Sequence, residues 1–82
     1  MTKYPQWQER LSRFQERQGI VAAASIGSID IEVKKRGNSF QVWVDLGGSS
    51  DKVHTANSLE DAKAWANSQY KSTSDPDFVS VW

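Results

Sequence analysis

Apolar and polar residues alternate most clearly in the middle of the chain. Every second residue is apolar over positions 29–33 and again over positions 40–46. A period of two is typical of a β-strand with one buried face. The two stretches flank Gly37-Asn38, and glycine followed by asparagine suits a two-residue hairpin turn. The pattern therefore predicts an antiparallel β-hairpin.

The turn also predicts the register of this hairpin. If Arg36 faces Ser39, the aliphatic residues lie together on one side. These cross-strand pairs are Val33 with Val42, Ile31 with Val44, and Ile29 with Leu46. The pairs on the other side are Lys34 with Gln41, Glu32 with Trp43, and Asp30 with Asp45. We expect the aliphatic side to enter the core and the second side to be polar apart from Trp43.

The first residues predict a helix that extends from about Pro5 to Gly19. Proline suits a first helical turn, and Trp7, Leu11 and Phe14 recur at helical spacing. Gly19 follows as a stop signal. Trp7 is then expected in the core.

The remaining segments are shorter. Positions 20–28 form either an irregular connector or a first strand, in which Gly27 would mark a bulge or bend. Positions 52–56 predict a third strand. Positions 57–71 predict a second helix, capped by Asn57 or Ser58. Its expected core residues are Leu59, Ala62, Trp65, Ala66 and Tyr70.

The chain closes on "DPDFVSVW", where apolar and polar residues alternate again after Pro76. We expect a short C-terminal strand, paired either within the same sheet or with a second copy in a homodimer. The predicted fold class is thus a single compact α+β domain over residues 1–82. Its expected order is α-β-β-β-α-β: an N-terminal helix, a three-stranded antiparallel meander, a second helix and the C-terminal strand.

The composition of the chain limits the class of protein further. The 82 residues include no cysteine, which excludes disulfides and thiolate metal sites. The start of the chain is polar, and the longest apolar run, 20–26, is too short to span a bilayer. We expect a cytoplasmic protein. Net charge is zero, yet positions 1–40 carry seven basic against four acidic residues and positions 41–82 carry three against six. This asymmetry indicates either a bipolar surface or, if folding brings the two halves together, charges that cancel.

Residues suited to catalysis are sparse. His54 is the single histidine, and a lone strand histidine is typical of a half-exposed structural position. Glu60 and Asp61 suit the N-terminus of the second helix. Gly47-Gly48 lacks the spacing of a phosphate-binding loop. We therefore expect a non-enzymatic protein without a cofactor or metal.

The aromatic and charged residues indicate binding instead. Trp43, on a polar sheet face, is a candidate interface anchor, unless the chain's own tail or a second copy covers it. Opposed Asp30 and Asp45 either meet a basic group or reach water at the hairpin end. The candidate protein-binding residues are Trp43, Glu32, Asp30, Asp45, Gln41 and Trp82. A nucleic-acid alternative uses Arg10, Arg13, Arg17, Lys34, Lys35 and Arg36.

Two resemblances extend these expectations. The order α-β-β-β-α, with "LEDAKAWANSQY" as its last helix, resembles the double-stranded RNA-binding domain and implies RNA binding. That family carries a lysine cluster where this chain has Ser58 to Asp61.

The second resemblance concerns "T-x-x-S-L-E-D-A-K-A-W-A", from Thr55 to Ala66. A short antiparallel sheet followed by this stretch resembles small accessory proteins encoded by phages and other mobile elements. It implies a protein that binds and inhibits a host machine, such as a nuclease or a CRISPR effector complex. The leading expectation is a protein-binding protein of this kind; the alternatives are a nucleic-acid-binding module and a self-associating structural protein.

Overall fold

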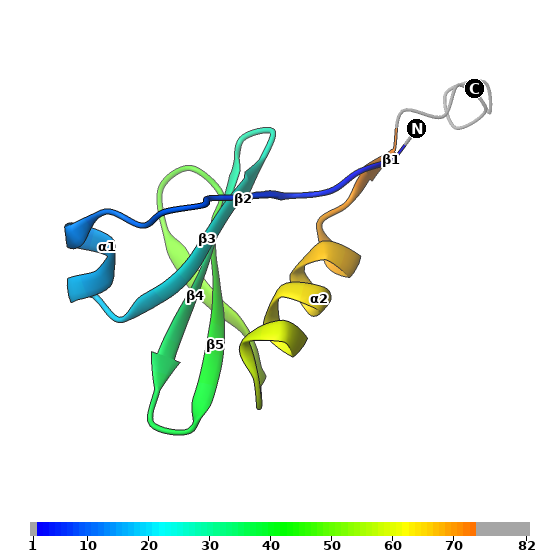
Figure 1. The fold of residues 1–82 in the computed structure, drawn as a ribbon. Coiled ribbons are helices and arrows are strands. Elements are labelled where there is room, and N and C mark those ends of the chain that lie inside the picture. Colours follow the sequence, from blue (N-terminus) through cyan, green and yellow to red (C-terminus); the bar gives the residue numbers. More distant parts are fainter. Residues whose placement is uncertain (1, 74–82) are drawn as a thin grey trace, which may run out of the picture.

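The protein is mostly β-structure. A computed structural model describes residues 2–73 and shows a five-stranded antiparallel sheet, a two-stranded sheet and two helices (Figure 1). The larger sheet has the order β2-β3-β4-β5-β6. Its strands are β2 (Gln6–Trp7), β3 (Ile20–Ile26), β4 (Ile29–Arg36), β5 (Ser39–Asp45) and β6 (Ser50–Ala56). The expected order α-β-β-β-α-β is therefore wrong, because the predicted first helix is reduced to Arg13–Arg17 and the strands β2 and β3 join the sheet.

The central hairpin follows the predicted register. β4 and β5 pair from Arg36 with Ser39 through to Asp30 with Asp45. Gly37 has a φ of 62°, and no other type of residue has a positive φ in the described chain. The turn thus needs the left-handed conformation only at its first position, where glycine adopts it without steric cost. The predicted pair of Ile29 with Leu46 is wrong, because β5 stops at Asp45 and Leu46 is 70% exposed instead of buried.

The predicted first helix is wrong over most of its length. β2 pairs with β3 through Gln6 opposite Ser25 and Trp7 opposite Ala24. Helix α1 spans only Arg13–Arg17. It begins there because Ser12 and Gln15 form a reciprocal capping box, with backbone-to-side-chain distances of 3.1 and 2.8 Å. The helical spacing of Trp7, Leu11 and Phe14 was therefore coincidental, and Phe14 is 69% exposed.

Residues 20–26 form a full strand, so the strand interpretation of this segment is confirmed. Gly27, with a φ of 58°, lies in the turn between β3 and β4. Ala22 and Ala24 face the core.

Helix α2 (Leu59–Gln69) packs against β4, β5 and β6. Ser58 is its N-cap and accepts a hydrogen bond from the Asp61 N–H at 3.1 Å. Ala62 and Ala66 are fully buried against Ile31, Val33 and Val42. The side of the sheet that carries α2 is called the inner face below.

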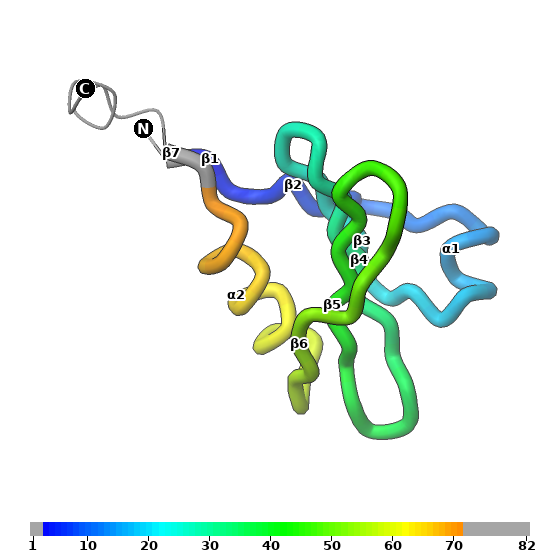
Figure 2. The backbone as a smooth tube through the Cα atoms, turned by 180° about the vertical axis from the view of Figure 1, so that it is seen from behind, coloured from blue at the N-terminus to red at the C-terminus, as the bar shows by residue number. Residues whose placement is uncertain are grey.

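Helix α1 lies at the end of β3 on the other side of the sheet from α2, as the ribbon and the reverse view both show (Figures 1 and 2). The small sheet pairs β1 (Thr2–Lys3) with β7 (Ser72–Thr73), so the two ends of the described chain meet. The predicted C-terminal strand and Trp82 lie outside the described residues. Within residues 2–73, no helix has the length and apolar character needed to cross a membrane.

Candidate protein-binding face

The sheet surface turned away from α2, called the outer face, carries most of the polar strand residues. Because side chains alternate along a strand, the residues between the core positions of β3 to β6 point to this side. Hydrogen-bonded rows cross it from strand to strand. They comprise Ser25, Asp30, Asp45 and Ser50; Ala23, Glu32, Trp43 and Lys52; Lys34, Gln41 and Thr55; and Arg36 with Ser39.

Trp43 occupies the middle of this face and is half-buried. Its indole Nε1 donates a hydrogen bond to the Gln41 Oε1 atom at 3.2 Å. The Lys34 ammonium lies 4.5 Å from the centroid of the ring, within the range of a cation–π interaction. These two neighbours hold the indole in place while the rest of its surface stays accessible.

One end of the outer face is acidic. Asp30 and Asp45 are direct cross-strand neighbours, as predicted. Asp45 Oδ1 accepts hydrogen bonds from the backbone N–H groups of Gly47 at 2.8 Å and Gly48 at 3.2 Å. These two bonds hold the pKa of Asp45 below its ordinary value of 3.8. The turn therefore stabilises the charge on Asp45 that opposes Asp30.

The acidic end continues into a shallow hollow of about 290 Å³. The residues that line it include Ala23, Glu32, Asp30, Asp45, Gln8 and Gln15. Gln8 reaches this position because its N–H donates to the Ala23 carbonyl at 2.8 Å. Gln15 comes from α1, which packs on β3. Helix α1 and the segment before it thus form a raised rim along the β3 side of the face.

The opposite end of the outer face is basic, through Lys34 and Arg36. Arg36 Nη2 donates to the Gln18 carbonyl at 3.2 Å, which ties the end of β4 to the end of α1. Gly19 is pressed against this guanidinium, so a side chain there would collide with Arg36 Nη1. Arg36 is therefore the one residue that connects the two halves of the predicted basic set.

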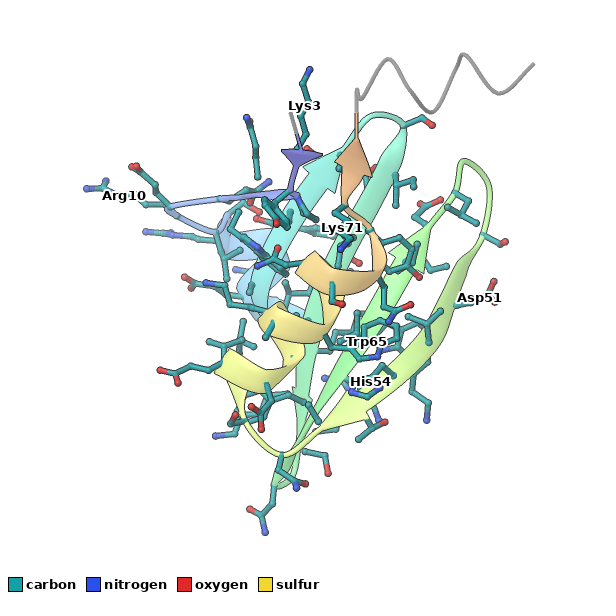
Figure 3. All side chains as sticks on the ribbon, turned by 90° about the vertical axis from the view of Figure 1, so that its right-hand side faces the viewer. Lys3, Arg10, Asp51, His54, Trp65 and Lys71 are labelled. Atoms are coloured by element: carbon teal, nitrogen blue, oxygen red, sulfur yellow. The ribbon has the colours of Figure 1, made fainter. Side chains whose placement is uncertain are left out.

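The six predicted basic residues do not form a single patch. Lys35 points to the inner side of the sheet, with its ammonium 5.9 Å from the Phe40 ring centroid. Arg13 and Arg17 lie on α1, and Arg10 lies on the segment before it, pointing away from the sheet (Figure 3). In contrast, Trp43, Glu32, Asp30, Asp45 and Gln41 share the outer face. Trp82, the sixth residue of that set, is outside the described chain.

Two aromatic contacts were missed by the sequence analysis. His54 stacks on Trp65 of α2, with ring centroids 4.3 Å apart and an interplanar angle of 3° (Figure 3). A bulge between Val42 and Trp43 places His54 opposite Val42, on the inner face. No pattern of alternation would have revealed that bulge. The only histidine therefore packs between β6 and α2, away from the outer face.

Trp7 forms the second contact. Its indole Nε1 donates to the Asn67 Oδ1 atom at 3.0 Å, and the Lys63 ammonium lies 5.2 Å from its ring centroid. It thereby fastens β2 to α2 across 60 positions of sequence. Trp7 packs against the core as expected, but it does so half-buried on the edge strand β2, so its predicted helical position was wrong.

Two larger hollows flank α2. One, of about 540 Å³, lies between Trp7, Leu11, Val21 and Leu59. The other, of about 530 Å³, is lined by Ile26, Ile29 and Tyr70 with Lys3 and Lys71 at its margin. In the part of the chain that the structure describes, no three His, Asp or Glu side chains are grouped to hold a metal ion.

Comparison with known protein families, with characterised proteins and with solved structures found no match to this chain.

Proposed function

We propose that this protein is a non-enzymatic binding protein that contacts another protein through its outer face. The observation that carries the proposal is the placement of Trp43 at the centre of that face, fixed by Gln41 and Lys34. Interface hot spots are enriched in tryptophan and sit near the centre of a contact, surrounded by polar groups. Asp30, Glu32 and Lys52 supply such a rim.

The geometry also supports the proposal energetically. A tryptophan that is already held by its neighbours loses little side-chain freedom when a partner covers it. Covering the rest of the ring removes apolar surface from water, which contributes about 25 cal/mol per Å². The acidic hollow beside Glu32 favours a partner that carries a basic side chain next to the apolar group that covers Trp43.

The resemblance to phage-type accessory proteins would make the partner a host machine, such as a nuclease or a CRISPR complex. Thr55 to Ala66, the stretch that carries it, covers the end of β6 and the first part of α2. Three of its alanines, at 56, 62 and 66, are core residues. The resemblance thus rests partly on residues that pack α2 onto the sheet. The outer face itself gives no separate support to a nuclease or a CRISPR complex as the partner.

Affinity capture tests the proposal. Immobilised wild-type protein, Trp43→Ala and Leu46→Ala are exposed to the same lysate. Leu46 is a matched control because it is an exposed apolar residue outside the outer face. We expect proteins retained by the wild type and by Leu46→Ala to lose at least about tenfold in retention on Trp43→Ala, as for a hot-spot residue.

Retention of the same proteins at the same level by all three forms would contradict the proposal. Retention that survives Trp43→Ala but falls steeply with rising salt would instead indicate nucleic-acid binding through the basic residues.

A further inference from the structure

The outward residues of β4 are arranged in an order that complements itself. They are Asp30, Glu32, Lys34 and Arg36, so the strand carries two negative charges followed by two positive charges. β4 is the central strand of the sheet. The row therefore runs through the middle of the outer face and gives it an acidic and a basic end.

A two-fold rotation matches this row to itself. Consider two sheets stacked with their outer faces together and a two-fold axis midway between them, perpendicular to the strands. Rotation about this axis places β4 of the second copy over β4 of the first, with the opposite strand direction. An axis placed midway between Glu32 and Lys34 then sets Glu32 against Lys34 of the second copy, and Asp30 against Arg36 of the second copy. Each pair occurs twice, because such an interface is isologous. Opposite charges meet at all four positions.

The neighbouring strands agree with the same axis. In β5, the rotation places Trp43 of each copy over Gln41 of the other. Each indole would therefore cover a Gln41 amide that already accepts the hydrogen bond of Trp43 in its own copy. In β6, Lys52 would lie over Thr55 of the second copy. Stacked sheets lie about 10 Å apart, a distance that these long side chains can bridge over β4, β5 and β6. β3 lies beside the α1 rim and stays outside the proposed contact. No like charges are opposed in this arrangement.

From these positions we propose that the protein bound by the outer face is a second copy of this chain, packed face to face about a two-fold axis between Glu32 and Lys34. This inference rests on the proposed function of the outer face and names its partner.

The size of the face sets the expected strength. Strands β4 to β6 have seven or eight residues each, whereas Ala23 on the outer side of β3 is already buried beside α1. At about 3.3 Å per residue and about 4.8 Å between strands, these three strands present roughly 330 Å² of planar surface. This area is well below the about 800 Å² per partner of a standard interface, even though side-chain relief adds to it. We therefore expect a dimer of micromolar rather than nanomolar affinity, weakened by salt because it relies on charge pairs.

Sedimentation velocity of the purified chain, from about micromolar to millimolar concentration at low salt, tests the inference. Wild type is expected to shift from monomer to dimer. Glu32→Lys places like charges at two positions and should weaken the dimer about 100-fold. The double variant Glu32→Lys/Lys34→Glu exchanges the charges and should recover wild-type affinity. Glu60→Lys, on the exposed surface of α2, is the control with the same change of charge and should leave the dimer intact.

Circular dichroism of each variant verifies that the fold is retained. A dimer that resists Glu32→Lys, or that the double variant fails to restore, would overturn the inference. So would a chain that stays monomeric throughout. If the monomeric chain still shows Trp43-dependent capture of another protein, the proposed function stands and only its partner changes; if that capture is absent as well, both fail.

Discussion

At the scale of single residues, most of the informative side chains are held by one or two specific contacts. Trp43 is fixed by Gln41 and Lys34, while Trp7 is fixed by Asn67. Both indoles donate their N–H to an amide oxygen, yet their roles differ. Trp7 joins two elements of the fold, whereas Trp43 joins neighbours within one face. A tryptophan's hydrogen-bond partner thus helps to separate a structural residue from a candidate anchor.

Asp45 provides a prediction on pH. Its pKa is lowered by the N–H groups of Gly47 and Gly48, so the carboxylate contributes stability that is present above its unfolded pKa. That contribution should be lost as pH falls through the lower, folded pKa. We expect urea unfolding between about pH 6 and about pH 2.5 to show a smaller acid-induced loss of stability for Asp45→Asn than for wild type, since the neutral amide still accepts both bonds.

An identical loss of stability in wild type and Asp45→Asn at every pH would show that the turn does not stabilise the charge. The comparison is direct, because both proteins share every other carboxylate.

At the scale of secondary-structure elements, local signals were reliable where the element depends on its neighbours in sequence. The β4–β5 register follows from a two-residue turn, and the start of α2 follows from the Ser58 cap. The N-terminal segment was mispredicted because β2 pairs with a strand 17 or more positions later. Helical spacing carries no information about such a partner. Ser12 and Gln15 were the one local sign that the helix begins at Arg13.

The turn between β4 and β5 gives a prediction at this scale. Gly37 has a φ of 62° with open space around it, so an added methyl group would meet strain but no collision. We expect Gly37→Ala to lower the free energy of unfolding by about 1–2 kcal/mol, the cost of a left-handed alanine. Gly48→Ala, at a glycine without a positive φ, should change it by less than about 0.5 kcal/mol.

Chemical denaturation of the three proteins under identical conditions provides the values. A change for Gly37→Ala as small as that for Gly48→Ala would contradict this prediction. It would mean that the turn tolerates a side chain and that other contacts maintain the register.

At the scale of the whole molecule, one helix covers one face of the sheet and leaves the other to α1 at its margin (Figures 1 and 2). This arrangement explains why the sequence predicted which residues share the outer face more accurately than it predicted the fold. The members of the face on β4 and β5 follow from one hairpin. The rim contributed by Gln8 and Gln15 could not be predicted, since it depends on where the N-terminal segment crosses β3.

The charge difference between the two halves of the sequence has to be compared with the charge pattern of the folded molecule. Positions 1–40 are basic and positions 41–82 acidic, but folding does not separate the charges by half of the chain. It places both signs along β4 itself, with Asp45 at the acidic end. The outer face is consequently neutral in sum and dipolar in pattern, which favours a partner of opposite order over a uniformly charged one.

The central claim is that the outer face around Trp43 is the contact surface, and the indole N–H signals in ¹H–¹⁵N spectra test it most directly. The signal of Trp43 is assigned with Trp43→Phe, and spectra are recorded across a dilution series and with any captured partner. We predict that the Trp43 signal moves on binding while those of Trp7 and Trp65, held by Asn67 and His54, stay in place. A fixed Trp43 signal, with movement at Trp7 or Trp65 instead, would contradict the claim.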